Sequence, residues 1–311
     1  MRSDMADRRL QVFHAVAKHL SFTKAAEALF MTQPAVTFQI KQLEEHFNAR
    51  LFERGHGQIS LTQAGRVVFD YAERILGLTS ELDARLRDMT GQMAGPLLIG
   101  ASMTIAEYLL PTVLGEFNAR YPEVLPRLVV ANSETVQNQV AEHSLDLGFI
   151  ESDSLLPSLV TEVVCEDELL VVCAPSHPLA KLASVPPDVL AQHAYVCREP
   201  GSGTREVSDR HLQMLGIAPE SLQPVMELGS PEALKGVVAT GRGYAIMSRA
   251  TVVKETRLGL LVGVALEPRL VRNLAFVYSK QKFYSKLVST FVAFAKERLA
   301  AMQPWKDVRG A

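Results

Sequence analysis

Three polar side chains at intervals of four residues could read the edges of DNA bases. Gln33, Thr37 and Lys41 are spaced so that they share one face of a helix. A glutamine can pair with adenine, a threonine methyl group can contact thymine, and a lysine can reach guanine or a phosphate. The opposite face of the same segment is apolar: Val36, Ile40, Leu43 and Phe47.

A second group of residues could bind a small anion. They lie where short apolar runs end and helices are expected to begin. Free backbone N–H groups and the helix dipole favour an anion at such points, and hydroxyl groups add hydrogen-bond donors. Serine and threonine are also preferred helix caps without any ligand, so both interpretations stay open. The candidates are Ser102, Thr104, Ser133, Glu151, Gly203, Thr204 and Ser230.

Glu151 is unusual in this second group, because a carboxylate repels an anion. We expect Glu151 either to pair with a basic residue across the cleft or to discriminate against a wrong ligand. Arg205 could supply a positive charge if its side chain turned inward.

Two short helical patterns must position the first group. The first runs from Thr23, which could cap it, to Phe30. The second follows a break at Met31–Pro34, where Thr32 can cap and the proline fits a first helical turn. Two helices joined in this way are typical of a helix-turn-helix, whose second helix enters the major groove. A two-helix piece of an ordinary core has a similar pattern.

A hairpin and a long helix follow. Residues 51–61 read as two short strands around Gly55–Gly57, a hairpin whose tip, with Arg54 and His56, could approach the DNA backbone. Thr62 is expected to cap a helix that continues to about Thr90. Its apolar residues recur almost as a heptad, which suits pairing with the same helix of a second copy. Packing on the C-terminal α/β part of the same chain is the alternative. The apolar positions are Val68, Tyr71, Ile75, Leu78, Leu82, Leu86 and Met89.

From Leu97 onward, short apolar runs alternate with helical segments. This pattern predicts an α/β arrangement, with a parallel sheet covered by helices on both faces. In such sheets ligands bind beyond the carboxyl ends of the strands, where the second group of residues lies.

The motifs of the first 65 residues together resemble the DNA-binding domain of LysR-type transcriptional regulators. The matching features occur in the family's order: Ala25–Ala26, Gln33-Pro34-Ala35-Val36, Leu43–Glu44, Leu51–Phe52 with Arg54, and Leu61–Thr62 with Ala64–Gly65. The resemblance covers nearly the whole chain, because the remainder has the length and pattern of that family's sensor domain.

The resemblance implies an α/β protein with a helix-rich N-terminal part. It implies a winged helix-turn-helix domain at 5–65, a linker and dimerisation helix at 62–91, and an effector-binding sensor at 95–302. The sensor would resemble two-lobed periplasmic solute-binding proteins, with lobe I at 95–165 and 268–302 and lobe II at 166–267. Operator DNA would be contacted by Thr23, Lys24, Gln33, Pro34, Thr37, Phe38, Lys41, Arg54 and His56.

Three strings in the second lobe resemble a branch of the family that includes regulators of carbon dioxide fixation and of sulfur assimilation. They are Glu199–Glu206, Glu227–Lys235 and Val238–Ser248. This resemblance implies a small anionic effector, such as a phosphorylated sugar, a nucleotide or a sulfur oxyanion. The implied partners are operator DNA, RNA polymerase and further copies of the chain in a homodimer or homotetramer.

Composition restricts the other possibilities. A chain of 311 residues suits two or three units, and 48% hydrophobic residues is ordinary for a globular protein. The net charge is −2, so any basic DNA-binding surface must be local. Three cysteines are too few for a disulfide framework, and no signal peptide or membrane-spanning run is evident, so we expect a cytoplasmic protein.

Enzymatic function is not expected. The sequence lacks the phosphate-binding loop, the zinc-protease motif and the nucleophile elbow, and its histidines and cysteines lack metal-ligand spacing, so no metal and no cofactor are expected. A solute-binding component is one alternative. A thiol redox regulator is another, in which Cys165 and Cys173 would approach each other across a turn; core residues are the simpler interpretation of these cysteines.

Overall fold

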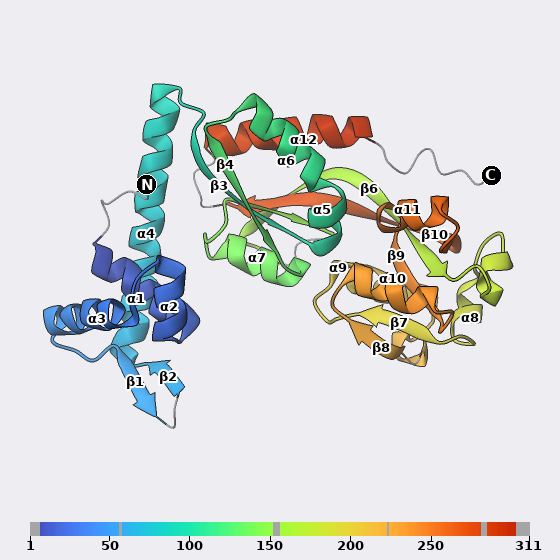
Figure 1. Cartoon of the computed structure of the whole chain (residues 1–311), viewed down its shortest axis with the longest axis horizontal. Helices are drawn as coiled ribbons and strands as arrows, with labels where there is room; N and C mark the ends of the chain where they lie inside the picture. Colours follow the sequence, from blue (N-terminus) through green and yellow to red (C-terminus); the bar gives the residue numbers. More distant parts are fainter. Residues whose placement is uncertain (1–6, 56–57, 152–155, 223, 281–284, 303–311) are drawn as a thin grey trace. The chain divides into compact units, whose positions relative to one another are not determined.

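The computed structural model describes residues 7–55, 58–151, 156–222, 224–280 and 285–302, with the backbone only at residues 54, 55, 58, 80 and 302. The chain divides into two compact units, Met1–Gln92 and Met93–Ala311. Figure 1 shows the two units.

The first unit consists of three helices, a β-hairpin and a long fourth helix. Their bounds are α1 Arg8–His19, α2 Phe22–Leu29, α3 Gln33–Phe47, β1 Phe52–Gly55, β2 Gln58–Leu61 and α4 Gln63–Thr90. Apolar side chains of α1, α2 and α3 form one core, in which Phe13, Ala25 and Val36 are fully buried. This arrangement confirms the expected winged helix-turn-helix.

Local capping fixes where these helices begin and end. Thr32 accepts a hydrogen bond from Ala35 N at the start of α3, and Thr62 accepts one from Gly65 N at the start of α4, as the sequence predicted. Gly91 ends α4 in the left-handed region, where glycine is not strained. The expected cap of α2 was wrong: Ser21, not Thr23, accepts the hydrogen bond from Lys24 N, and the helix begins at Phe22.

Helix α4 has two apolar faces. One packs on the core of the first unit through Val68, Phe69 and the buried Ala72. The other is exposed along the helix, for example 65% at Leu78 and 41% at Leu82. The exposed side chains are Tyr71, Ile75, Leu78, Leu82, Leu86 and Met89, which are the heptad positions other than Val68.

The second unit is built on an eight-stranded mixed sheet of order β4-β3-β5-β10-β6-β9-β7-β8. The strands are β3 Gly95–Ala101, β4 Val124–Val130, β5 Leu147–Ile150, β6 Leu159–Cys173, β7 Tyr195–Arg198, β8 Pro224–Leu228, β9 Tyr244–Ser248 and β10 Val262–Ser279. The longer helices are α6 Leu110–Arg120, α7 Ser133–Ala141, α9 Gly203–Met214, α10 Pro231–Ala239 and α12 Lys286–Met302. Shorter helical segments are α5 Met103–Tyr108, η1 Pro178–Lys181, α8 Pro187–Leu190, η2 Pro219–Leu222, η3 Arg249–Val252 and α11 Val253–Arg257.

Two lobes are recognisable by their separate apolar cores. The first lobe packs α6 and α12 on one side of β3, β4 and β5, where Phe117 and Phe276 contact Phe291, and α7 on the other side (Figure 1). The second lobe buries β7, β9 and the ends of β6 and β10 among α9 and α10. The expected two-lobed α/β sensor is therefore confirmed.

The sequence did not predict how the lobes are joined. The apolar runs at 169–174 and 274–278 are parts of two long strands, β6 and β10, which pair antiparallel from Val262↔Cys173 to Ser279↔Leu159. Both strands contribute to both cores, so the sheet is mixed instead of parallel. The strands were missed because half of β6 is only partly buried and contains acidic residues, which interrupt the apolar pattern.

Candidate functional sites

The outer face of α3 is polar and accessible. Gln33 and Lys41 are exposed and Thr37 is half-buried, whereas Val36, Ile40 and Leu43 are buried beneath them. Gln33 Nε2 donates to Thr37 Oγ1 at 2.9 Å, and Lys41 Nζ lies 3.6 Å from Glu45 Oε1. These contacts are exposed and easily exchanged for contacts with DNA.

The other expected DNA-binding residues lie on three elements, α2, α3 and the β1–β2 hairpin. Thr23 and Lys24 lie exposed on the first turn of α2, and Pro34 and Phe38 are exposed on α3, with Phe38 at 57%. The backbone of Arg54 pairs with Ile59 in the β1–β2 hairpin. His56 lies outside the described residues.

Most of the expected anion-binding residues converge between the lobes around the carboxylate of Glu151, which is 2% exposed. Ser102 Oγ of the first lobe donates to Glu151 Oε1 at 2.8 Å, and Thr204 Oγ1 of the second lobe donates to Oε2 at 2.8 Å. Thr104 lies close enough to this carboxylate to help lower the pKa of Glu151. The carboxylate of Glu151 thus already uses the hydroxyl donors that were expected to bind an anion.

Arg272 of β10 completes this cluster, and sequence reasoning missed it. Its Nη1 donates to Glu151 Oε2 at 2.7 Å and to Thr204 Oγ1 at 2.9 Å, and its Nε donates to Asp167 Oδ2 at 2.8 Å. Ser248 Oγ donates to the other oxygen of Asp167 at 2.8 Å. Glu151 therefore pairs with a basic residue, the first of its two expected roles, while Arg272 lies between two buried carboxylates.

The pKa values of the two carboxylates are shifted in opposite directions. Burial alone would raise the pKa of Glu151, but Arg272 and three hydroxyl groups lower this pKa to about 2. The pKa of Asp167 is raised, because burial, together with the charge of Glu151, outweighs its contacts with Arg272 and Ser248. The cluster therefore has one excess negative charge when both groups are ionised.

Close packing of the lobes explains the role of Gly203. A Cβ atom on Gly203 would lie 2.7 Å from Ser133 Oγ and 2.9 Å from Glu151 Cβ, so a larger residue would push the lobes apart. Ser133 itself is buried, and its hydroxyl accepts a hydrogen bond from Glu151 N at 3.4 Å. Ser230 is separate from this cluster: it caps α10 by accepting a hydrogen bond from Ala233 N.

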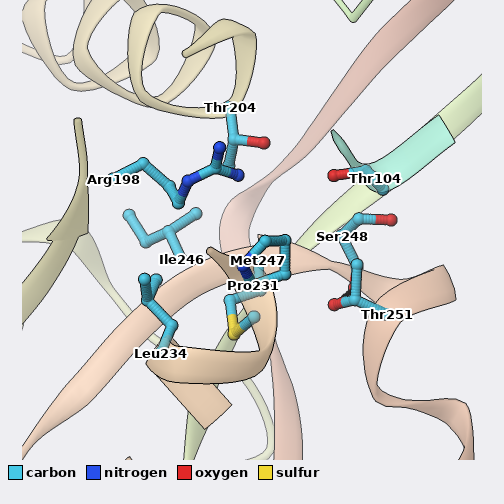
Figure 2. A pocket seen from close by; sticks show the side chains of 9 residues that line it. All are labelled: Thr104, Arg198, Thr204, Pro231, Leu234, Ile246, Met247, Ser248 and Thr251. Atoms are coloured by element: carbon cyan, nitrogen blue, oxygen red, sulfur yellow. Dashed lines mark hydrogen bonds between the residues drawn. The ribbon is translucent and has the colours of Figure 1, made fainter. Parts of the chain in front are cut away.

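A small pocket of about 10 Å³ adjoins the cluster, enough for one water molecule. Figure 2 shows Thr104, Ser248 and Thr251 on one side and Arg198 with Ile246 and Leu234 on the other. Thr104 belongs to the first lobe and the rest to the second, so the pocket lies between the lobes. Thr204, Pro231 and Met247 complete the lining.

Arg198 supplies the cationic group of this pocket. It is 5% exposed, and its Nε and Nη2 donate to the carboxylate of Glu199 at 2.7 and 2.9 Å. Within the described residues, Nη1 of Arg198 has no hydrogen-bond partner. Arg205, the cation considered from the sequence, instead donates to Arg198 O and to Glu227. An arginine directly after an apolar run was the available signal for Arg198.

A second contact joins the lobes beside the pocket. The hydroxyl of Tyr108, on α5, donates to Glu232, on α10. Lys235 Nζ lies over the Tyr108 ring and also pairs with Glu232 and Glu255. These contacts hold the lobes together at the side of the pocket formed by α10.

The cysteines do not form the pair considered from the sequence. Cys165 and Cys173 lie on the same strand, β6, so no turn brings them together. Burial raises the pKa of Cys165 to about 12 and that of Cys173 to about 11, and it also raises the pKa of Cys197.

The described part of the chain lacks two further features. No group of three or more histidine, cysteine or acidic residues is arranged to hold a metal ion. No helix there has the length and apolar character needed to cross a membrane.

Comparison with known proteins agrees with both units. Residues 8–66 match the model of bacterial regulatory helix-turn-helix proteins of the LysR family, and residues 90–300 match the LysR substrate-binding domain. A probable RuBisCO transcriptional regulator of Cyanidioschyzon merolae is 37% identical over 287 residues, which cover 91% of this chain and 95% of that protein. A second, from Nostoc, is 32% identical over 289 residues, with 91% and 85% covered.

Solved structures show the same architecture. The regulatory domain of Synechocystis CcmR in complex with 2-PG aligns with a TM-score of 0.62 at 26% identity, covering 67% of this chain and 99% of that one. Full-length AphB aligns with a TM-score of 0.66 at 17% identity, covering 94% and 98%, which shows the fold alone. With both family models matched in order and curated relatives above 30% identity, the chain belongs to the LysR family of transcriptional regulators.

Proposed function

We propose that the sensor unit of this regulator binds a small anionic metabolite between its two lobes. The observation that supports this most directly is the buried Arg198, whose Nη1 is unpaired among the described residues and which lines the interlobe pocket. The N-terminus of α9 adds to the positive potential, because Ser202 makes no capping hydrogen bond there. A relative, CcmR, is known in complex with 2-PG, so a ligand of this domain has a precedent.

The pocket is too small for a metabolite in the closed arrangement, since it holds only about 10 Å³. Binding must therefore change the angle between the lobes or move the Glu199 side chain away from Arg198. A ligand shifts such an equilibrium only by binding one arrangement more tightly than the other. We infer that the effector acts by stabilising a more open arrangement.

We further propose that the protein works as a homodimer or homotetramer on operator DNA. The exposed apolar face of α4 suits pairing with the same helix of a second copy. Two copies would place two α3 helices on two half-sites, so the operator should be an imperfect palindrome. A change in lobe angle would then alter how the operator is bound and bent, which RNA polymerase would sense in the cytoplasm.

The relatives favour a role in carbon dioxide fixation, because those reported above are probable RuBisCO transcriptional regulators. A thiol redox regulator is the less suitable alternative, since burial raises the pKa of every cysteine. Thermal unfolding of the full chain with sulfate, thiosulfate, phosphoglycolate, ribulose bisphosphate and reduced nicotinamide nucleotides tests the anion proposal. A true effector should raise the Tm and change operator mobility in gel shifts, whereas stabilisation only by apolar or cationic compounds contradicts it.

A further inference from the structure

Two neutral hydroxyl groups reach across the gap between the lobes of the sensor unit. Thr204 Oγ1, in the second lobe, donates to Glu151 Oε2 of the first lobe at 2.8 Å. The hydroxyl of Tyr108, in the first lobe, donates to Glu232 of the second lobe. Burial, together with Glu232, raises the pKa of Tyr108, so the phenol keeps the proton that it donates. In both contacts a neutral donor meets a charged acceptor of the other lobe.

Glu151 keeps its counterion when the lobes separate. Its carboxylate lies 2.7 Å from Arg272 Nη1, and Glu151 directly follows β5, which pairs with β10, the strand of Arg272. Asp167, the other partner of this guanidinium, lies opposite Arg272 in the register of β6 and β10. Because the three charged groups are held on or next to paired strands, they move together. Movement of α9 removes only the contacts of Thr204 with Glu151 and with Arg272 Nη1.

Glu232 likewise has a counterion within its own lobe. Lys235 lies on the same helix, α10, and its Nζ is 2.7 Å from Glu232 and 2.7 Å from Glu255 of α11. The same ammonium group donates to Thr251 O at 3.1 Å. When Tyr108 moves away, its hydrogen bond and the contact of its ring with Lys235 are lost, but no ion pair is broken.

This arrangement makes lobe separation inexpensive. Breaking a buried ion pair leaves an uncompensated charge and is strongly unfavourable, whereas a single hydrogen bond contributes a modest net free energy because water can replace it. We propose that Thr204 and Tyr108 are latches, residues that hold the lobes of the ligand-free chain closed and release them without breaking an ion pair. The two hydroxyls thus set how often the lobes open. The inference goes beyond the proposed anion binding, because it concerns the protein without a ligand.

Hydrogen exchange of the ligand-free full chain, followed by mass spectrometry, measures the opening. Peptides covering the start of α7 report lobe separation, because Ser133 is fully buried there and Glu134 N donates to Gly201 O of the second lobe at 3.5 Å. Peptides covering β9, which is buried throughout, report global unfolding. Exchange becomes faster in proportion to the population of the open form, so the two sets of peptides separate opening from loss of stability.

Thr204→Val and Ser102→Ala form a matched pair. Both hydroxyls donate to the carboxylate of Glu151 at 2.8 Å, but the bond from Ser102 lies within the first lobe. Thr204→Val should speed exchange at the start of α7 by about three- to tenfold, the factor expected for the loss of one hydrogen bond. Ser102→Ala should leave the ratio of exchange at α7 to exchange at β9 unchanged.

Tyr108→Phe and Tyr244→Phe form a second pair. The hydroxyl of Tyr244 donates to Leu190 O at 3.2 Å, and both residues belong to the second lobe. Tyr108→Phe should speed exchange at the start of α7 by about three- to tenfold, whereas Tyr244→Phe should not. In the variant that combines Thr204→Val with Tyr108→Phe the two factors should multiply, because one motion breaks both bonds.

Three results would overturn the latch assignment. The first is equal acceleration by Thr204→Val and Ser102→Ala, and the second is a double variant that is no faster than the faster single variant. The third is exchange at the start of α7 that is as slow as in β9 in the wild type and every variant. In that case the lobes do not separate, and the opening inferred for the effector is wrong as well. None of these results affects anion binding itself, which the thermal unfolding experiment measures.

Discussion

Nη1 of Arg272 lies 2.7 Å from Oε2 of Glu151, and both side chains are 2% exposed. Nη2 of the same arginine lies 2.7 Å from Asp167, whose side chain is 1% exposed. One guanidinium thus pairs with two carboxylates where β6 and β10 pass between the lobes. Its removal should cost more than the removal of either carboxylate, because only the former leaves two buried negative charges together.

Replacing Arg272 with methionine should lower the free energy of unfolding by about 3–5 kcal/mol, the usual consequence of leaving buried charges unpaired. Urea unfolding followed by circular dichroism measures this. The control is Arg85→Met, because Arg85 lies 2.6 Å from Glu81 on a more exposed surface and should cost less than about 1 kcal/mol. Equal effects of the two substitutions would mean that burial of the cluster does not determine its contribution.

A fall in pH should change the contributions of the two carboxylates to the free energy of unfolding in opposite directions. The lowered pKa of Glu151 means that its ionised form stabilises the fold above the ordinary value of about 4.3, and this stability is lost as the pH falls through about 2. The raised pKa of Asp167 means that stability is gained as the pH falls and is lost as the pH rises through its folded value.

Asp167→Asn should therefore be less destabilising than Glu151→Gln at pH 7, because it removes the carboxylate whose ionisation is unfavourable in the fold. The difference in free energy of unfolding between these two variants should shrink between pH 4.3 and 2. In this range the wild type loses the stability that ionised Glu151 contributes. Urea midpoints across this range provide the measurement. A larger cost for Asp167→Asn at pH 7 would contradict the assigned directions.

The parts of the fold that depend on local chemistry could be predicted from sequence. Thr32, Thr62 and Gly91 mark helix ends because capping involves only neighbouring residues. Most of the residues at strand ends that were grouped as an anion site lie together, as shown by the bonds of Ser102 and Thr204 to Glu151, but Ser230 does not join them.

The missed residues depend on contacts between distant segments. Arg272 faces Asp167 because β10 pairs with β6 in one register, and Arg272 follows Asp167 by 105 positions. No local pattern reports such a register. The hydroxyls were expected as donors to an anion, but they donate their hydrogen bonds to the buried carboxylate of Glu151. This arrangement can be seen only when the position of Glu151 in the fold is known.

Thr37 and Lys41 should contribute to operator binding in different ways. Thr37→Ala should weaken binding by about 1–3 kcal/mol at one base pair and relax the preference there, if the methyl group contacts thymine. If Lys41 contacts a phosphate, Lys41→Ala should lower affinity for all sequences and reduce the slope of log K against log salt by about 0.9. Quantitative gel shifts at several salt concentrations measure both, with unchanged Tm values as the folding control. Unchanged affinity in both variants would refute the assigned face of α3.

The exposed face of α4 should mediate dimerisation. Replacing both Leu78 and Leu82, which are 65% and 41% exposed, with aspartate should dissociate the oligomer while leaving the core of the first unit intact. Light scattering at micromolar concentration follows the mass. Arg66→Glu is the control, because Arg66 is an exposed residue of α4 that does not belong to the apolar stripe. A monomeric wild type would exclude this interface.

The native thiols should react slowly with peroxide. The thiolate is the reactive form, and burial raises the pKa of Cys173 to about 11, so the thiolate fraction near pH 7 is smaller by roughly a hundredfold or more than for a free cysteine. Cys173 follows Cys165 by eight positions along β6, a span of about 26 Å, whereas a disulfide needs Cα atoms within about 7 Å. Mass spectrometry after brief peroxide treatment should therefore find reduced thiols in the folded protein and oxidation in a urea-unfolded control. Rapid, stoichiometric sulfenic acid or disulfide formation in the folded protein would instead favour redox sensing over ligand sensing.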